Sequence, residues 1–447
     1  MTDALPIIIV ALPFASAALL ASIASWRIGI WINAGSAGLL FLLACLLPWQ
    51  PHAPTLLLHV GLPETHLVLL TSFIAMTTSW FSRRDVPASL AMRSLDRRRV
   101  RLYHAACQAL VGAILLALLS DNLMLTWLAL AIAIAAATGM IGAIRSQAAT
   151  HAASRLLLLC GVGLMLALLG TLLLYVAAEP HAAALHWSTL QSTPHHTATF
   201  DLACVFLLIG YGAMAGAVPL HAWLADAAAD GVASGSMIIG AVLVNAPLLM
   251  FMRLRAAIGP IAGLPATVLM ALGLLTLLLG IDGLFAQTDT RRSVAFAGVA
   301  QIGIIVVAIG IGGPAATFAA WLSITLLALA RATALQCQGL PSTQLASWTR
   351  RSSILALAIL PLFMLFLIAG STVWLLLPLG VGVLLTSALL FARMPILAPT
   401  VAAPRGGGLS ELAALTPIWL QLALILLLAF AMPAPMLDWF NAMAAAR

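Results

Sequence analysis

The sequence alternates long apolar stretches with short segments that carry almost all of its charge. About fourteen of these stretches are roughly 18 to 24 residues long, which is enough for a helix to cross the hydrocarbon core of a bilayer. With 63% hydrophobic and 7% charged residues, the chain has too little polar surface to cover a water-soluble fold. We therefore predict an all-α integral membrane protein with spans near 5–26, 28–48, 64–81, 103–119, 122–144, 155–178, 200–219, 234–253, 262–284, 293–312, 315–336, 353–371, 372–392 and 414–432.

The basic residues predict how the chain is oriented. All 20 of them are arginines, and positive charge collects in cytoplasmic segments. The densest group lies at 82–101, between the third and fourth spans, so we place this loop in the cytoplasm. Alternation from there puts both chain ends on the outer side of the inner (plasma) membrane, and the first stretch is a retained helix because it lacks a signal-peptide pattern.

The same alternation places the segment 179–199, which contains histidines and no arginine, on the outer side of the membrane. We interpret it as a solvated, pH-sensitive loop, and the alternative of a metal site has no standard ligand spacing to support it. These histidines are His181, His186, His195 and His196.

Composition and motifs exclude several classes of function. The net charge of +7 is accounted for by the orientation of the chain in the membrane and by contact with anionic lipid headgroups, so it does not indicate nucleic-acid binding. Phosphate-binding loops, nucleophile elbows and HExxH are absent, and the five cysteines have no ligand or disulfide spacing. We expect no cofactor and no metal, and any electron transfer must reside in another subunit. The cysteines are Cys45, Cys107, Cys160, Cys204 and Cys337.

One segment, 210–245, interrupts the apolar pattern most strongly. Gly212 and Gly216 loosen a helix that Pro219 then breaks. His221 and Asp226 follow the break, and we expect them on a half-helix near the cytoplasmic side, with Trp223 and Asp230. Broken helices beside polar groups form ion sites in many transporters, whereas the structural alternative is a simple kink in which His221 bonds a carbonyl.

Other interruptions are simpler. Gly310 to Pro314 predicts the outer turn between two spans, and Pro361 predicts a kink with no ionisable neighbour. Arg331 lies inside an apolar run, where it is either functional or extended toward the cytoplasmic surface. Asn245 is expected to bond a neighbouring helix.

At the level of whole motifs, the chain resembles the membrane subunits shared by respiratory complex I, Mrp-type cation/proton antiporters and group 4 membrane-bound hydrogenases, most closely hydrogenase-4 component F. Matching stretches are 122–131, 155–175, 289–303 and 312–335. The match is densest, and without a gap, in the broken segment at Gly210, Tyr211, Gly212, Gly216, Pro219, His221, Trp223, Leu224, Asp226, Ser236 and Asn245.

The resemblance implies two inverted five-helix repeats around a discontinuous helix and a hydrated polar axis that carries protons. It divides the single domain 1–447 into N-terminal helices (1–101), a first repeat (102–254), a second repeat (255–393) and a C-terminal helix (394–447). It also implies partners, namely other membrane subunits and a cytoplasmic-side redox or catalytic module.

Most of the titratable positions of that axis are lost here. Family glutamates fall on Ala131 and Ala300, and a lysine falls on Met214. Family histidines fall on polar or apolar residues, and two further lysines fall on arginines, which cannot release a proton near neutral pH. The histidine positions are Gln301, Ser323 and Leu327, and the arginines are Arg155 and Arg331.

Three functional hypotheses follow. The first is an antiporter-like subunit of a complex I or hydrogenase-4 type oxidoreductase, which moves protons or cations through His221, Asp226, Asp230 and water held by Asn245, Gln301 and Ser323. The second is a membrane scaffold that has lost the proton path. The third is the membrane partner of an inorganic-carbon uptake system, docked through the loop 82–101.

Overall fold

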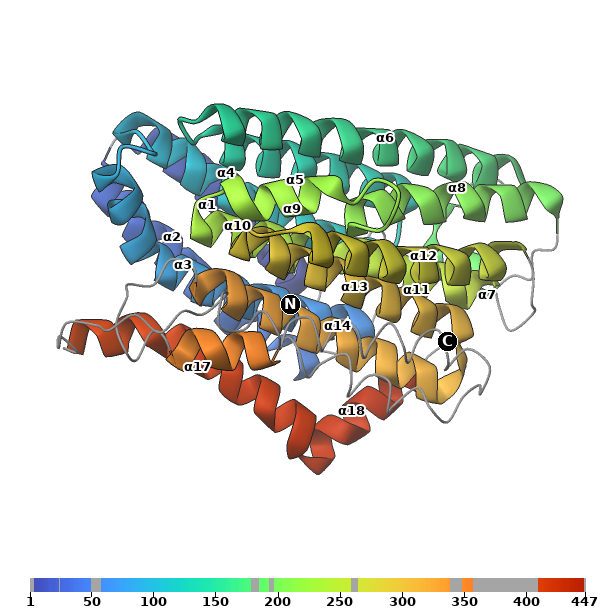
Figure 1. Ribbon diagram of the computed structural model, residues 1–447. Coiled ribbons are helices and arrows are strands. Elements are labelled where there is room, and N and C mark those ends of the chain that lie inside the picture. Colours follow the sequence, from blue (N-terminus) through green and yellow to red (C-terminus); the bar gives the residue numbers. More distant parts are fainter. Residues whose placement is uncertain are drawn as a thin grey trace.

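The computed structural model of the chain describes residues 4–23, 25–49, 58–177, 185–192, 197–258, 264–337, 348–356 and 409–445. Nearly all of this part is helical, and most helices run side by side in one bundle (Figure 1). Its main helices are α1 (Ala4–Ser22), α2 (Trp26–Ala44), α3 (Leu62–Ala91), α4 (Arg97–Leu119), α5 (Leu123–Gly142), α6 (Gln147–Ala177), α7 (Trp187–Ser192), α8 (Ala198–Ala215), α9 (Ala222–Asp230), α10 (Ala233–Ile238), the π-helical η3 (Ile239–Leu243), α11 (Asn245–Ile258), α12 (Leu264–Ala286), α13 (Thr290–Ile311), α14 (Gly313–Gln336), α17 (Leu409–Phe430) and α18 (Ala434–Ala445).

Ten helices within the described ranges are long and apolar enough to cross a membrane, and an eleventh span is counted if the bent pair α17–α18 is taken as one. The prediction of an all-α membrane protein is confirmed. The third expected span lies on α3, which is helical but is not among the ten. The expected spans 353–371 and 372–392, with Pro361, lie almost entirely outside the described residues, so the count of fourteen and the inverted repeats stay predictions.

Burial separates central helices from peripheral ones. In the most apolar 18-residue window, 94% of residues are buried in α14 and in the segment Ala233–Ile258, against 33% in α1 and α2. A helix that is apolar on all sides is stable only in a core or against lipid. The bundle therefore has α10, η3, α11, α13 and α14 at its centre, and large apolar side chains of α6 and α12 on its surface.

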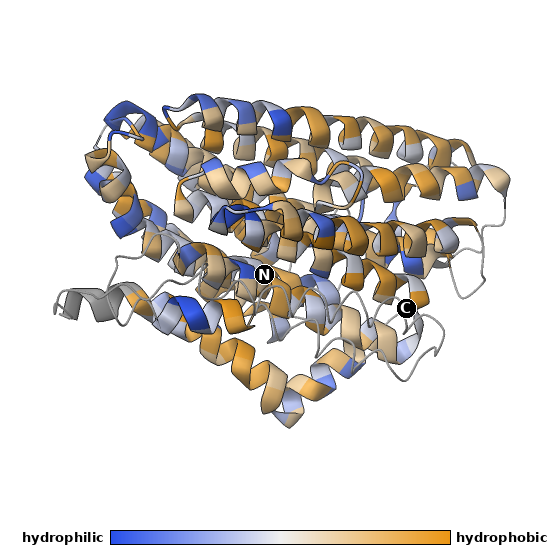
Figure 2. Ribbon diagram, in the orientation of Figure 1, coloured by the Kyte–Doolittle hydropathy of each residue, from blue (hydrophilic) through white to orange (hydrophobic). Residues whose placement is uncertain are grey.

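The arginine-rich segment is mostly helical rather than a loop. α3 continues to Ala91 and α4 begins at Arg97, so only residues 92–96 join them. The expected loop 82–101 is corrected accordingly, because arginine, serine and alanine are compatible with helix and their charge does not end one. Arg83 lies over the rings of Trp80 and Trp31, at 3.5 and 4.6 Å from their centroids. Figure 2 shows hydrophilic residues gathered toward this end of the bundle.

At the end of the chain, two helices stand where the sequence analysis expected one. α17 and α18 are bent by 74° relative to each other and form a V beside α14 (Figure 1). The ring of Phe440 in α18 lies 5.1 Å from His66 of α3 and 5.9 Å from Phe318 of α14, measured between centroids. α18 thus contacts both helices at the end of the bundle away from the arginine-rich turn.

Glycine permits very close helix contacts. A Cβ atom added at Gly163 of α6 would lie 2.7 Å from the carbonyl oxygen of Gly210 in α8, and one at Gly280 of α12 would lie 2.5 Å from the backbone nitrogen of Ala300 in α13. Small residues let membrane helices approach through their backbones. These contacts hold α6 against α8 and α12 against α13.

The close contact of α6 with α8 at Gly163 predicts that one added methyl group lowers stability. Gly163→Ala should destabilise the protein by about 1 to 3 kcal/mol, because its Cβ meets backbone that cannot move aside. Thermal unfolding in detergent measures the change. Gly161→Ala is the matched control, since no atom lies within 4 Å of its added Cβ, and alanine is the better helix former. Equal melting curves for the two variants would show that the α6–α8 contact is not tight.

Candidate functional site

The break in the seventh expected span lies where the sequence placed it. α8 ends at Ala215, and Gly216 follows with a φ of +82°, a conformation that favours glycine. Backbone groups freed in a membrane need partners inside the protein. Here the amide of Val218 donates to Thr276 Oγ1 of α12 at 3.1 Å, and Trp223 Nε1 donates to the Ala213 carbonyl at 2.8 Å. The break is therefore a bonded structure held by α12 and by α9.

His221 is the first polar side chain after the break. It directly precedes α9, and its ring meets Phe296 of α13 edge-on, with centroids 6.0 Å apart. Its Nδ1 atom is buried and has no hydrogen-bond partner in the described part of the chain. An imidazole nitrogen can take up or give a proton, so His221 offers a titratable group beside the broken backbone.

The two carboxylates of α9 are held by arginines from two different helices. Asp226 accepts from Arg155 of α6 at 2.6 Å and lies 3.4 Å from Arg292 of α13, which is also 3.7 Å from Asp230. Arg291 adds donors to the carbonyls at the end of α9, at 3.2 Å for Ala229 and 3.0 Å for Gly231. The half-helix is thereby tied to both α6 and α13.

The remaining candidates lie on three different helices, α11, α14 and α13. Asn245, at the start of α11, donates to Thr71 of α3 at 3.4 Å. Ser323 bonds the carbonyl of Ala319 in its own helix. Gln301 is buried in α13, one helical turn from Gly298.

Arg331 does not reach the surface. Its side chain is buried, and a Cβ atom added at Gly298 would lie 2.7 Å from its Nε. Its Nη1 atom has no hydrogen-bond partner, and it forms no ion pair within the described ranges. Arg331 and Gln301 therefore belong to facing surfaces of α14 and α13, whereas Asn245 and His221 lie elsewhere.

Four of the positions where the family has titratable groups are apolar in this chain and closely packed. Met214, Ala300 and Leu327 are buried, and Ala131 packs against the core. Ser323, Leu327 and Arg331 are spaced four residues apart and so form one stripe on α14. At Ala300 the backbones of α12 and α13 nearly touch. A family-type series of exchangeable protons is not present along α13 and α14.

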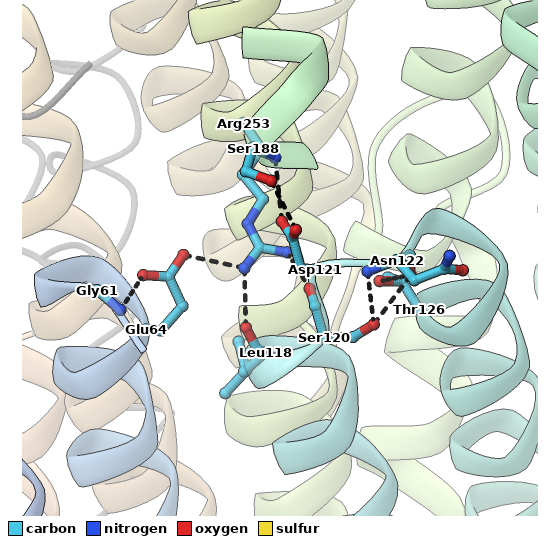
Figure 3. Close-up of polar contacts among 9 residues, drawn as sticks. All are labelled: Gly61, Glu64, Leu118, Ser120, Asp121, Asn122, Thr126, Ser188 and Arg253. Carbon is cyan, nitrogen blue, oxygen red and sulfur yellow. Dashed lines mark hydrogen bonds and ion pairs between the residues drawn. The ribbon is translucent and has the colours of Figure 1, made fainter. Parts of the chain in front are cut away.

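The sequence analysis missed a buried ion pair. Arg253 of α11 donates from Nη2 to Glu64 Oε1 of α3 at 2.9 Å, and both side chains are about one-twentieth exposed. The same guanidinium donates to the carbonyls of Leu118 and Ser120 at the end of α4, at 3.0 and 2.8 Å (Figure 3). The sequence analysis had only made Arg253 the last residue of the expected span 234–253. No local pattern joins two residues that are 189 positions apart.

The chain is thus a multi-pass bundle in which one span is broken beside a charged half-helix, as in antiporter-like membrane subunits. Residues 120–394, more than half of the chain, match the family described as "NADH:quinone oxidoreductase/Mrp antiporter, TM". The chain belongs to this family, and the resemblance seen in the sequence is confirmed.

Relatives and solved structures agree. A hydrogenase-4 component F homolog of Methylacidiphilum infernorum is 33% identical over 334 residues, which are 72% of this chain and 70% of the relative. The Mrp complex of Dietzia sp. DQ12-45-1b matches with a TM-score of 0.81 at 17% identity, over 100% of this chain and 97% of that chain. Thermus thermophilus complex I with bound aureothin gives 0.76 at 20% identity, over 97% and 99%. At these identities the structures show the fold.

One prediction concerns α9. Asp226→Asn removes the charge that Arg155 and Arg292 share, so we expect amide hydrogen exchange in α9 to become about fivefold faster, equivalent to ~1 kcal/mol for partly exposed pairs. Mass-spectrometric exchange on the detergent-solubilised protein measures it. Asp282→Asn is the control, because Asp282 is exposed on α12 and has no ion pair among the described residues. Unchanged exchange in α9 would mean that these ion pairs do not hold it.

A second prediction concerns the buried ion pair. Arg253→Met leaves Glu64 buried without its partner, which should lower the free energy of unfolding by about 3 to 5 kcal/mol. The double variant Arg253→Met, Glu64→Gln should recover a large part of that loss, because no uncompensated charge remains. Thermal unfolding of the three proteins measures both steps. A double variant as unstable as the single one would contradict this account.

Proposed function

We propose that the chain translocates protons or cations as the antiporter-like subunit of a complex of the respiratory complex I or hydrogenase-4 type. Membership of the family supports this class of function. Similar folds occur in an Mrp complex, in respiratory complex I and in an archaeal respiratory membrane complex. We infer partners of the same kind, namely other membrane subunits and a redox or catalytic module on the cytoplasmic side.

The observation that carries the proposal is the broken span. A helix interrupted within the bundle exposes backbone groups and a titratable side chain where water can bind. His221 lies at this break with a buried Nδ1 atom, and α9 beyond it presents Asp226 and Asp230. In this proposal His221 exchanges protons, and Asn245, Gln301 and Ser323 hold water.

Arginine has a different role from the lysines it replaces. The guanidinium stays charged at every physiological pH, so Arg155 and Arg331 act as fixed charges rather than relays. Arg155 does this by holding Asp226. We further propose that the arginine-rich end faces the cytoplasm and that both chain ends lie outside, as the distribution of arginines predicts.

A flux measurement on the purified complex in liposomes tests the proposal. Native protein should carry protons, and His221→Ala should abolish the flux while leaving the complex assembled, because no other imidazole lies at the break. His151→Ala is the matched control, since His151 is exposed on α6. Flux that is unchanged in His221→Ala would remove His221 from the mechanism.

The same preparation separates transport from the scaffold hypothesis. A native protein that carries no protons would support a scaffold. The variant Met214→Lys, Ala131→Glu then shows whether restoring two family groups restores transport. Nothing in the structure specifically favours a role in inorganic-carbon uptake.

A further inference from the structure

A stripe of small and polar side chains runs along the full length of α3. Starting at Glu64, the residues at alternating steps of four and three lie on one face of a helix. Six of these eight residues are polar, and the other two are small or medium-sized. The series is Glu64, Val68, Thr71, Ala75, Thr78, Ser82, Asp85 and Ser89. All but Asp85, which is half-buried, are buried.

This stripe faces α11, which comes after the break and after α9 and α10 in the sequence. Glu64 pairs with Arg253 of α11 at 2.9 Å. Thr71 accepts from Asn245 at 3.4 Å. Residue numbers rise along α3 while the residue numbers of the partners fall, so α3 and α11 are antiparallel. We call this row of polar contacts between the two helices the seam.

At the end of the seam near the arginine-rich turn, Asp85 binds α10. Its Oδ2 accepts from the amide and the hydroxyl of Ser234, at 2.8 and 2.7 Å. The Ser234 hydroxyl also lies 2.8 Å from the hydroxyl of Tyr103 in α4. The seam therefore has a carboxylate at each end, Asp85 near the arginine-rich turn and Glu64 at the opposite end.

The middle of the seam contains an unsatisfied group. Thr78 is 1% exposed, and its hydroxyl has no hydrogen-bond partner among the residues that the structure describes. By the antiparallel register, the residues opposite it are between Ser234 and Asn245, in or next to the π-helical η3. A π-helical segment interrupts the regular α-helical bonding and is frequent at functional sites. A buried, unpaired hydroxyl beside it is a place where an ordered water binds.

We propose that the seam between α3 and α10–α11 is a proton route, separate from the interface of α13 and α14. Glu64, Thr71, Thr78 and Asp85 follow one another about 10 Å apart along the helix, which is too far for direct hydrogen bonds, so the proposed route requires water molecules between them. Hydroxyl groups both donate and accept hydrogen bonds, and a proton passes by exchange of these bonds with no net chemical change.

Each end has a defined task. The proton enters on the Asp85 carboxylate and leaves from Glu64, which releases it when Arg253 re-forms the ion pair. This inference rests on the proposed function. α9, which begins directly after His221, is separated from α10 by only Gly231 and Val232.

The test compares two neighbouring threonines on α3. Thr78→Val removes the unpaired hydroxyl of the seam and keeps the side-chain shape. Thr77→Val makes the same change one residue away, where the hydroxyl bonds Phe73 and Ile74 carbonyls and accepts from Gln421 of α17. Proton flux in liposomes that contain the native complex or either variant is the measurement, with Thr78→Ser as the variant that retains the hydroxyl.

We expect Thr78→Val to lower proton flux about tenfold or more, Thr77→Val to stay within about twofold of native, and Thr78→Ser to keep native flux. Thr78→Val should be as stable as the native protein or more so, because a buried unpaired polar group is removed. Lost flux in a stable variant is therefore not a folding defect. If the native complex and the Thr78→Val variant carry protons equally well, the proton route along the seam is contradicted and the proposed function stands. A silent native complex overturns both.

Discussion

The absence of water inside the bilayer is the constraint on which this structure depends. Every backbone group freed by a helix break has to find a partner within the protein. At the break after Gly216 these partners are Thr276 of α12 and the indole of Trp223. Because the break is bonded in this way, the protein keeps a broken span, with His221 beside it, in the middle of a closely packed bundle.

Local signals made much of the fold predictable. Gly216 and Pro219 located the break, and Gly312 and Gly313, both with positive φ, form the turn expected between α13 and α14. Long-range contacts left no such signal. The pair of Arg253 and Glu64 joins residues far apart in sequence, and the continuation of α3 to Ala91 was hidden because arginine clusters suggested a loop.

The chain uses arginine as a tie between helices. Arg253 joins α11 to α3 and α4, and Arg155 and Arg292 join α6 and α13 to α9. A guanidinium suits this task because it presents several donors in a fixed plane and never loses its charge. In a chain without lysine, the proposed proton exchange uses other groups, namely carboxylates, an imidazole and hydroxyls.

The contact made by Phe440 has a mechanical consequence. α18 touches His66 of α3 and Phe318 of α14 at the same end of the bundle, and α17 joins it to the bundle through a sharp bend. α18 therefore covers one end of the interface between α3 and α14, which the hydrogen bond between His66 and Thr325 also joins, at 2.7 Å. Any separation of α3 from α14 at that end has to break the ring contacts of Phe440 as well as this hydrogen bond.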